Sequence, residues 1–182
     1  ERQEQFRKGL IRFIEEGRKL AAFRSEKGIV RVIDCVEANG SAYLIMEYLE
    51  GTLLEQLLRH ESRIPEEEAI QLLMNVMESL QHVHQANIIH REICPSNLFM
   101  CNDGVVKLID FAASRDTQVV FTRSLSVTVR SGYSPEEQYR GQNNLGPAAD
   151  IYSLAATLYR MITGVKPPDA MERLLAVEAE KK

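Results

Sequence analysis

Hydrophobic residues recur every three or four positions near the start of the chain, which is the period of one face of an α-helix. Within residues 1–23 they include Phe6, Leu10, Phe13, Ile14, Leu20 and Ala21. The same period runs over residues 66–84, directly after Pro65, and the three glutamates that open this range suit the first turn of a helix. We therefore predict two amphipathic helices over these ranges, the second ended by Asn87 in a left-handed conformation.

Two pairs of short apolar runs predict β-hairpins. Ile29–Val36 and Ala42–Tyr48 flank an Asn-Gly pair, which is a strong hairpin signal between apolar runs. Residues 97–101 and 105–109 flank an Asn-Asp-Gly turn. We predict an antiparallel hairpin at each of these places.

A third helix is predicted over Asp150–Thr163, which is apolar nearly all round and is therefore expected to be buried. Gly164 and the Pro167-Pro168 pair end it. Residues 112–134 are rich in Ser, Thr and Arg and predict an irregular segment. The order helix, hairpin, helix, loop, hairpin, long loop and buried helix predicts a mixed α+β fold.

Composition narrows the class of protein. With 182 residues and 45% hydrophobic content, the chain can bury the core of one domain or slightly more. The net charge of -4 gives no electrostatic reason to expect nucleic acid or an anionic membrane as partner. No apolar run approaches the ~18 residues of a membrane span, and ERQEQFRKG is not a signal peptide. Cys35, Cys94 and Cys101 lack CxxC spacing, which favours free thiols in a reducing cytosol.

The stretch Ile88–Met100, IIHREICPSNLFM, concentrates His, Arg, Glu, Cys and Asn between two apolar runs. It is either an active-site loop held between two short strands or an ordinary polar turn. Its neighbours along the chain separate these interpretations.

Six segments in order resemble the eukaryotic-type protein kinase family, in particular bacterial Ser/Thr kinases. HREICPSN is similar to the catalytic loop H-R-D-x-x-x-x-N, and LIDFAASR to the D-F-G segment. GYSPEEQY is similar to the A-P-E segment, and DIYSLAATLYRMITG to the buried helix of the large lobe. GLIRFIEEGRKLAAF resembles the C-helix of the small lobe, and YLIMEYLEG the strand and hinge that hold adenine. The resemblance covers about residues 6–170.

The resemblance implies a protein kinase-like α+β fold, with a mostly helical C-lobe and a partial N-lobe. Residues 1–49 would form the N-lobe part, and residues 50–182 the C-lobe up to the buried helix and the start of the next segment. No Gly-rich loop and no V-A-I-K strand precede Glu16. We therefore expect a fragment or trimmed part of a longer protein, and loss of most of the small lobe is the alternative.

The resemblance also assigns site residues, with ATP and Mg²⁺ as the implied ligands. The catalytic set is Glu92, Asn97 and Asp110. The metal ligands among them, with hard oxygen atoms that suit Mg²⁺, are Asn97 and Asp110. The nucleotide-binding set is Glu47, Leu49, Phe99 and Glu16. The structural and regulatory set is His90, Arg91, Phe111, Asp150 and Glu137.

Within the last set, the resemblance gives each residue a task. His90 and Phe111 would belong to the internal packing spine, and Asp150 would hold the backbone of the catalytic loop. Arg91 would clasp a phosphorylated activation loop. One of Glu136 and Glu137, with Glu137 the better match, would pair with a buried arginine beyond the end of this chain, so we expect the 182-residue chain to be less stable than an extended parent.

Four positions depart from the family pattern. Glu92 replaces the Asp that orients the substrate hydroxyl, and Cys94 replaces a Lys that neutralises the transferring phosphate. Ala112 replaces the Gly of D-F-G, and Arg130 falls near the Thr that contacts the catalytic Asp and Lys. Together these changes favour a pseudokinase, and replacement of residues 92 and 94 by the family's Asp and Lys is expected to raise any activity.

Two function classes remain open, besides a truncated gene without function. The first is a cytoplasmic nucleotide-binding or scaffolding pseudokinase that works through signalling partners. The second is an active but impaired Ser/Thr kinase that transfers the ATP γ-phosphate to a protein substrate, with Glu92 as base and the missing Lys supplied by the parent. Neither class implies nucleic acid or a membrane contact of this segment.

The segment from Ala113 to Ser134 is a candidate regulatory loop. Its hydroxyl residues are Thr117, Thr122, Ser124, Ser126, Thr128 and Ser131, and its possible cationic partners are Arg91, Arg115 and Arg123. A phosphate added there would order the loop against Arg91. A merely polar loop is the alternative.

Overall fold

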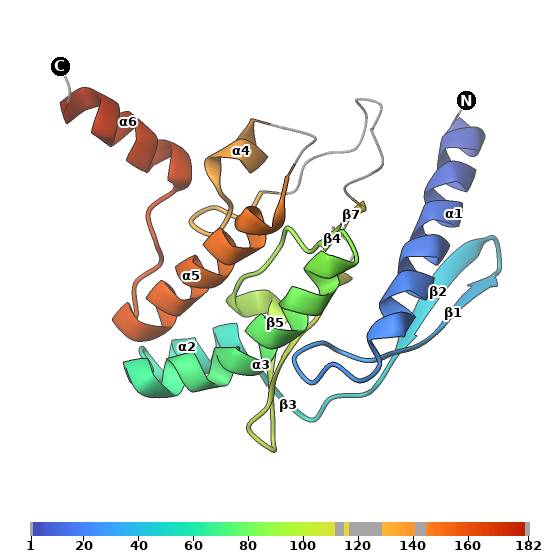
Figure 1. Ribbon diagram of the computed structural model, residues 1–182, viewed down its shortest axis with the longest axis horizontal. Coiled ribbons are helices and arrows are strands. Elements are labelled where there is room, and N and C mark those ends of the chain that lie inside the picture. Colours follow the sequence, from blue (N-terminus) through green and yellow to red (C-terminus); the bar gives the residue numbers. More distant parts are fainter. Residues whose placement is uncertain (1, 112–114, 117–128, 141–144, 181–182) are drawn as a thin grey trace.

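The structure of the protein is a computed structural model that describes residues 2–111, 115–116, 129–140 and 145–180. It contains a small N-terminal part, in which one helix covers a hairpin, and a larger, mostly helical part (Figure 1). This arrangement confirms the predicted α+β fold.

The N-terminal part is the predicted helix and hairpin. Its elements are α1 (Arg2–Leu20), the 3₁₀ turn η1 (Ala21–Phe23), β1 (Val32–Ala38) and β2 (Ser41–Met46). The strands are antiparallel and turn at Asn39 and Gly40, both with positive φ. Helix α1 approaches the hairpin closely at Gly17, where a Cβ would lie 2.9 Å from Leu44 Cδ1 and 3.0 Å from Cys35 Sγ.

The first strand begins three residues later than predicted, because residues 28–30 bond to another part of the molecule. The N–H of Leu108 donates to the Gly28 carbonyl at 2.8 Å, and the N–H of Val30 donates to the Leu108 carbonyl at 3.0 Å. These residues therefore fasten the N-terminal part to the larger part.

The larger part surrounds a core of aliphatic side chains. Its main elements are α2 (Leu54–Glu61), α3 (Glu66–Gln85), α5 (Pro147–Thr163) and a sheet of order β3-β5-β6, with β3 (Gly51–Leu53), β5 (Leu98–Cys101) and β6 (Val106–Leu108). Large side chains of the core include Leu54, Leu58, Leu73, Leu80, Leu98, Leu108 and Met161. The predicted second helix and second hairpin are confirmed, and Asn87 has the predicted left-handed φ of 59°.

Helix α5 is buried on one face, so the prediction of a buried helix is correct for that face only. Ile151 and Tyr159 are 54% and 46% exposed. The buried face carries small polar residues instead: the hydroxyls of Ser153 and Thr157 donate to carbonyls four residues earlier, at 3.0 and 2.9 Å. Such internal hydrogen bonds let a polar residue face the core. Gly164 ends the helix with a φ of 73°, as predicted.

Several short elements complete the fold. They are β4 (Ile88–Ile89), the 3₁₀ turn η2 (Pro95–Asn97), β7 (Arg115–Asp116), α4 (Glu136–Tyr139) and α6 (Ala170–Glu180). Strand β4 pairs antiparallel with β7. The loop that holds the cluster of functional groups thus lies between two short strands, β4 and β5. The hydrophobic pattern did not predict β3, α2, β7, α4 or α6.

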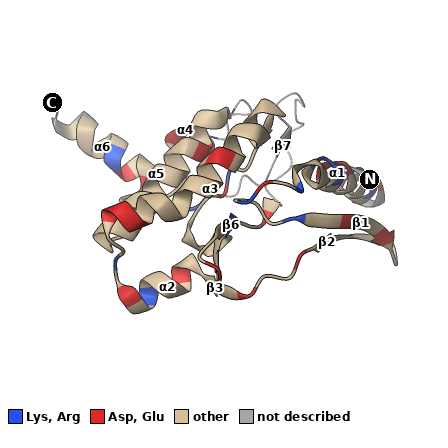
Figure 2. Cartoon of the chain, turned by 60° about the horizontal axis from the view of Figure 1, so that its bottom comes forward, with Lys and Arg blue, Asp and Glu red and all other residues tan. Residues whose placement is uncertain are grey.

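The charges are mixed along the surface helices. Figure 2 shows basic and acidic residues close together along α1, α2 and α6. Within the described ranges, no helix combines the length and apolarity that crossing a membrane requires.

Candidate active site

One buried carboxylate fixes the start of the loop after β4. Asp150, on α5, is fully buried. Its Oδ2 accepts the main-chain N–H of His90 at 2.9 Å, and its Oδ1 accepts that of Arg91 at 2.8 Å. Oδ2 also lies 2.8 Å from Nε2 of His84 at the end of α3. A buried charge is stable only when such partners replace water, so loop and helix hold each other.

The ring of His90 is a structural group of the site. Its Nδ1 accepts the N–H of Glu92 at 3.2 Å, so its Nε2, 3.2 Å from the Ile109 carbonyl, is the nitrogen that carries the proton. Burial lowers the pKa of His90 and outweighs the raising effect of Asp150, so the ring is neutral. The ring packs edge-on against Phe111, with centroids 4.6 Å apart.

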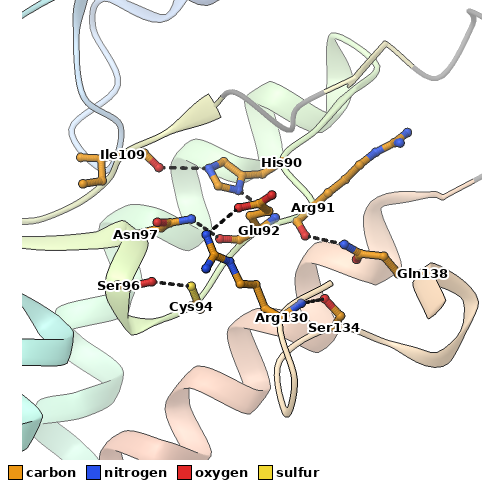
Figure 3. A network of polar contacts seen from close by, with 10 residues as sticks. All are labelled: His90, Arg91, Glu92, Cys94, Ser96, Asn97, Ile109, Arg130, Ser134 and Gln138. Atoms are coloured by element: carbon orange, nitrogen blue, oxygen red, sulfur yellow. Dashed lines mark hydrogen bonds and ion pairs between the residues drawn. The ribbon is translucent and has the colours of Figure 1, made fainter. Parts of the chain in front are cut away.

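Asn97 connects the loop with the strand that leads to Asp110 (Figure 3). Its side-chain NH₂ donates to the carbonyl of Glu92 at 2.8 Å. Its own carbonyl accepts the N–H of Ile109 at 2.9 Å. Since the amide nitrogen is used by the loop, the amide oxygen of Asn97 is the atom suited to a cation.

Two residues of this site have left-handed backbones. The φ angles of Arg91 and Asp110 are 73° and 61°. Such angles are costly for residues with a Cβ and persist where the surroundings impose them. The Asp150 contact at the Arg91 N–H and the Asn97 contact beside Asp110 are two such constraints.

Glu92 forms an ion pair with Arg130. Oε2 of Glu92 lies 3.1 Å from Nη2 of Arg130, and the two side chains are 8% and 43% exposed. Burial acts to lower the pKa of Arg130, but the hydrogen bond and charge of Glu92 outweigh it and raise that pKa. Figure 3 shows the guanidinium reaching from the segment before α4 to the carboxylate in the loop.

Cys94, also in the loop, is 2% exposed. Its Sγ lies 3.1 Å from the hydroxyl of Ser96. At the position where the resemblance predicts a Lys, this chain therefore has a buried thiol whose polar contact stays within the loop.

The four predicted nucleotide-binding residues lie on three different segments. Leu49 lies between β2 and β3, Phe99 is on β5, and Glu16 is on α1. Glu47 also follows β2, and its carboxylate lies 2.5 Å from Nζ of Lys107 on β6 and 2.8 Å from the N–H of Arg31. The structure therefore uses the Glu47 side chain to hold this connection in place.

Glu137 lies apart from the loop. It lines a pocket of about 480 Å³ between α4, α5 and α6, together with Tyr152 and Arg173. Its neighbour on α4, Gln138, is buried and donates from Nε2 to the Arg91 carbonyl at 3.0 Å.

Sequence reasoning missed several residues that hold the site together. They are His84, Lys107, Ser134 and Gln138. His84 lies at the end of α3, and its side chain is only 11% exposed. Its position at the next-to-last residue of a helix and six residues before His90 was the available signal.

Some predicted features fall outside the described residues. Ala112 is one of them, and so are the candidate phosphorylation sites Thr117, Thr122, Ser124, Ser126 and Thr128. Ser131 is described, and its hydroxyl accepts a hydrogen bond from Lys166 at 3.2 Å.

The residues present fit a magnesium ion. The amide oxygen of Asn97 and the carboxylate of Asp110 are hard oxygen donors, the type that Mg²⁺ prefers. Asn97 is 5% exposed and oriented by the Glu92 carbonyl. Among the described residues, no cluster of three or more His, Cys, Asp or Glu residues could hold a metal by protein ligands alone. Mg²⁺ typically keeps waters and phosphates as further ligands, which agrees with this donor set.

Comparison with known proteins gives one consistent result. The family model described as "Protein kinase domain" matches residues 1–180. A probable serine/threonine-protein kinase of Clostridium perfringens is 34% identical over 158 residues, which are 86% of this chain and 23% of that protein. Serine/threonine-protein kinase PknB of Mycobacterium leprae is 33% identical over 164 residues, 86% of this chain and 26% of that protein. The chain thus spans about a quarter of the length of these curated relatives.

Proposed function

Because this chain belongs to the protein kinase family, we propose that it carries the catalytic loop of an ATP-dependent Ser/Thr kinase whose phosphoryl transfer is impaired. In this proposal, residues 1–49 belong to the N-lobe and residues 50–182 to the C-lobe of a cytoplasmic protein kinase domain. The observation that carries the proposal is the position of Glu92. It is fixed by the same loop that presents Asn97, but its carboxylate is bound by Arg130.

The proposed reaction needs little covalent work from the protein. A Ser or Thr hydroxyl oxygen of the protein substrate attacks the γ-phosphorus of ATP. A new O–P bond forms, and the bond from the γ-phosphorus to the bridging oxygen breaks. ADP leaves with that electron pair, and the hydroxyl proton passes to the Glu92 carboxylate. Asn97 and Asp110 would hold Mg²⁺, which neutralises phosphate charge when bound.

Two features account for impaired transfer. Glu92 has one more methylene than Asp, and a misplacement of about 1 Å can cost ~100-fold in rate. One of its two oxygens is also engaged by Arg130. The hydrogen bonds that position Glu92 nevertheless link it to its surroundings: Asp150 holds His90, and His90 and Asn97 hold the Glu92 backbone.

A second candidate is a pseudokinase that binds ATP and acts as a scaffold for signalling partners. The observation that favours it is Cys94, which offers no positive charge to a phosphate. In both candidates Glu47 and Leu49 contribute hinge backbone contacts to the nucleotide, and Glu16 and Phe99 line its site.

The test measures transfer of radiolabelled phosphate from ATP to a generic protein substrate by the full-length protein. Slow transfer that Glu92→Gln abolishes and Glu92→Asp increases by about tenfold or more supports the impaired kinase. Nucleotide binding without transfer by the wild-type protein and by Glu92→Asp favours the scaffold. Transfer that survives Glu92→Gln would show that Glu92 is not the base.

A further inference from the structure

The catalytic loop of this chain lacks a positive charge of its own at position 94. Transfer of a phosphoryl group needs fixed positive charge at the phosphate oxygens, because charge spreads over them in the transition state. Cys94 is neutral as a thiol and is bonded within the loop to Ser96. A kinase of this sequence therefore requires another source of charge.

A guanidinium occupies the neighbourhood of this position. Nη2 of Arg130 reaches Glu92, two residues before Cys94, at 3.1 Å. Burial acts to lower the pKa of Arg130, and the hydrogen bond and charge of Glu92 outweigh it, so the guanidinium is held in its charged form. A guanidinium presents five N–H donors in a planar fork that suits phosphate oxygens. The contact with Glu92 engages one terminal nitrogen of that fork.

The backbone holds Arg130 in a defined turn. Its N–H donates to the hydroxyl of Ser134 at 2.9 Å, and its carbonyl accepts the N–H groups of Tyr133 and Ser134 at 2.9 and 2.8 Å. Ser134 is 1% exposed. Gly132 in this turn has a φ of 81°, and a Cβ there would lie 2.6 Å from the carbonyl oxygen of Pro167. The turn therefore fits closely against the segment after α5.

The side-chain exposures separate two roles for this arginine. If Arg130 served only to neutralise Glu92, burial of both groups would strengthen the pair. Instead, Glu92 is 8% exposed and Arg130 43% exposed. The carboxylate is thus the enclosed partner, and the cation faces the solvent from which a substrate arrives.

We propose that Arg130 supplies the positive charge that Cys94 lacks, with its guanidinium bound to the terminal phosphate of ATP during transfer and oriented by Glu92. The inference rests on the proposed kinase function and adds a catalytic residue to it. Arg130 keeps its proton throughout, so the bonds formed and broken are those already given for the transfer step.

The first test compares variants of the full-length protein in steady-state transfer of radiolabelled phosphate. Arg130→Ala is expected to lower kcat by about 100-fold, because it removes a fixed charge at the phosphate, and to weaken the binding of ATP by about tenfold. Arg130→Lys keeps the charge and should retain most of the rate. Arg140→Ala is the matched control, since Arg140 is 51% exposed and, among the described residues, pairs only with Glu136 on the helix that ends just before it.

The second test is a complementation. Cys94→Lys in the wild-type background is expected to change kcat less than twofold, because Arg130 already provides the charge. In the Arg130→Ala background, the same substitution should restore at least tenfold. Restoration would not follow if Arg130→Ala merely damaged the fold, and equal melting temperatures of the variants provide a direct check.

The outcomes separate this inference from the kinase proposal. An unchanged rate of transfer in Arg130→Ala overturns the role of Arg130 and leaves the kinase proposal intact. A higher rate in Arg130→Ala also overturns that role, because it shows that the ion pair restrains Glu92. If no variant transfers phosphate, equilibrium binding decides: Arg130→Ala should weaken binding of Mg²⁺-ATP about tenfold relative to Mg²⁺-ADP. If the ratio of the affinities for Mg²⁺-ATP and Mg²⁺-ADP is the same in Arg130→Ala as in the wild type, the inference is overturned. If the protein binds neither nucleotide, both proposals are overturned.

Discussion

The main-chain N–H of Gly28 donates a hydrogen bond of 3.0 Å to the hydroxyl of Ser79, 51 residues later in the chain. Ser79 is buried in the middle of the third helix of the sequence, α3. The backbone of Gly28 therefore lies directly on that helix, at the place where the N-terminal part joins the larger part.

A side chain at position 28 is expected to destabilise the protein strongly. In Gly28→Ala the new Cβ would lie 2.1 Å from the carbonyl oxygen of Asn75 and 2.5 Å from the nitrogen of Val76, both in the backbone of α3. Separation of these groups should cost about 3 kcal/mol in free energy of unfolding, measured by urea denaturation. Gly9→Ala is the control with the opposite sign: nothing lies within 4 Å of it, and alanine stabilises a helix by about 0.5–1 kcal/mol.

Asp150→Asn should destabilise the loop that it holds. Asn keeps one acceptor oxygen, but its NH₂ group would face a main-chain N–H that now donates to a carboxylate oxygen. We expect a loss of about 3 kcal/mol, seen as a drop of roughly 6–12 °C in Tm by calorimetry. Asp103→Asn, at an exposed turn, should leave Tm nearly unchanged. A small effect at position 150 would contradict the central role of this carboxylate.

The pair of Glu47 and Lys107 should make stability depend on acid pH. Burial acts to raise the pKa of Glu47, but the hydrogen bond and charge of Lys107 outweigh it and lower that pKa in the folded state. The pair's contribution, about 1 kcal/mol, is therefore complete above the unfolded pKa of about 4.3 and is lost as pH falls through the folded pKa. The difference in unfolding free energy between wild type and Lys107→Met should follow this course from pH 7 to pH 3.

The control for this pH profile is Lys8→Met. Lys8 pairs with Glu4 at 3.2 Å, but both side chains are more than 70% exposed. Exposed pairs of this kind contribute little, so its curve should coincide with that of the wild type. If the difference in unfolding free energy between wild type and Lys107→Met were constant at all pH values, the contribution of the pair would not depend on the ionisation of Glu47.

Gly132→Ala is expected to displace the turn that carries Arg130. The substitution would place a Cβ 2.6 Å from the Pro167 carbonyl oxygen and force a residue with a Cβ to a φ of 81°. We expect about a tenfold loss of phosphate transfer through misplacement of the guanidinium. Gly146→Ala provides the comparison, because nothing lies within 4 Å of that position. Full activity of Gly132→Ala would show that the turn tolerates movement.

The helices with strong periodicity were predictable because their apolar faces are continuous in the sequence. The range 66–84 agrees with α3 to within one residue at each end. Helix α2 was missed although Leu54, Leu57 and Leu58 have helical spacing. It spans only 8 residues, too short for a clear period. The burial of α5 was misjudged because its apolar residues face both ways and its polar residues satisfy themselves internally.

Motif order located the candidate site but could not give its contacts. The motif alignment placed Arg130 near the family's Thr position but did not predict its ion pair with Glu92. That pair depends on the turn that Ser134 stabilises. The same holds for Lys107 and Glu47, 60 residues apart. Such contacts arise from tertiary packing, and no local pattern announces them.

Two chain segments connect the N-terminal hairpin with the larger part, and both are fastened to one short strand, β6. The first, at residues 28–30, bonds to the backbone of Leu108, and the second bonds through the Glu47 carboxylate to Lys107, the adjacent residue. A sliding motion of α1 and the hairpin would break both attachments at once. Because Gly28 also donates to Ser79 of α3, motion between the two parts is resisted at β6 and at α3 alike.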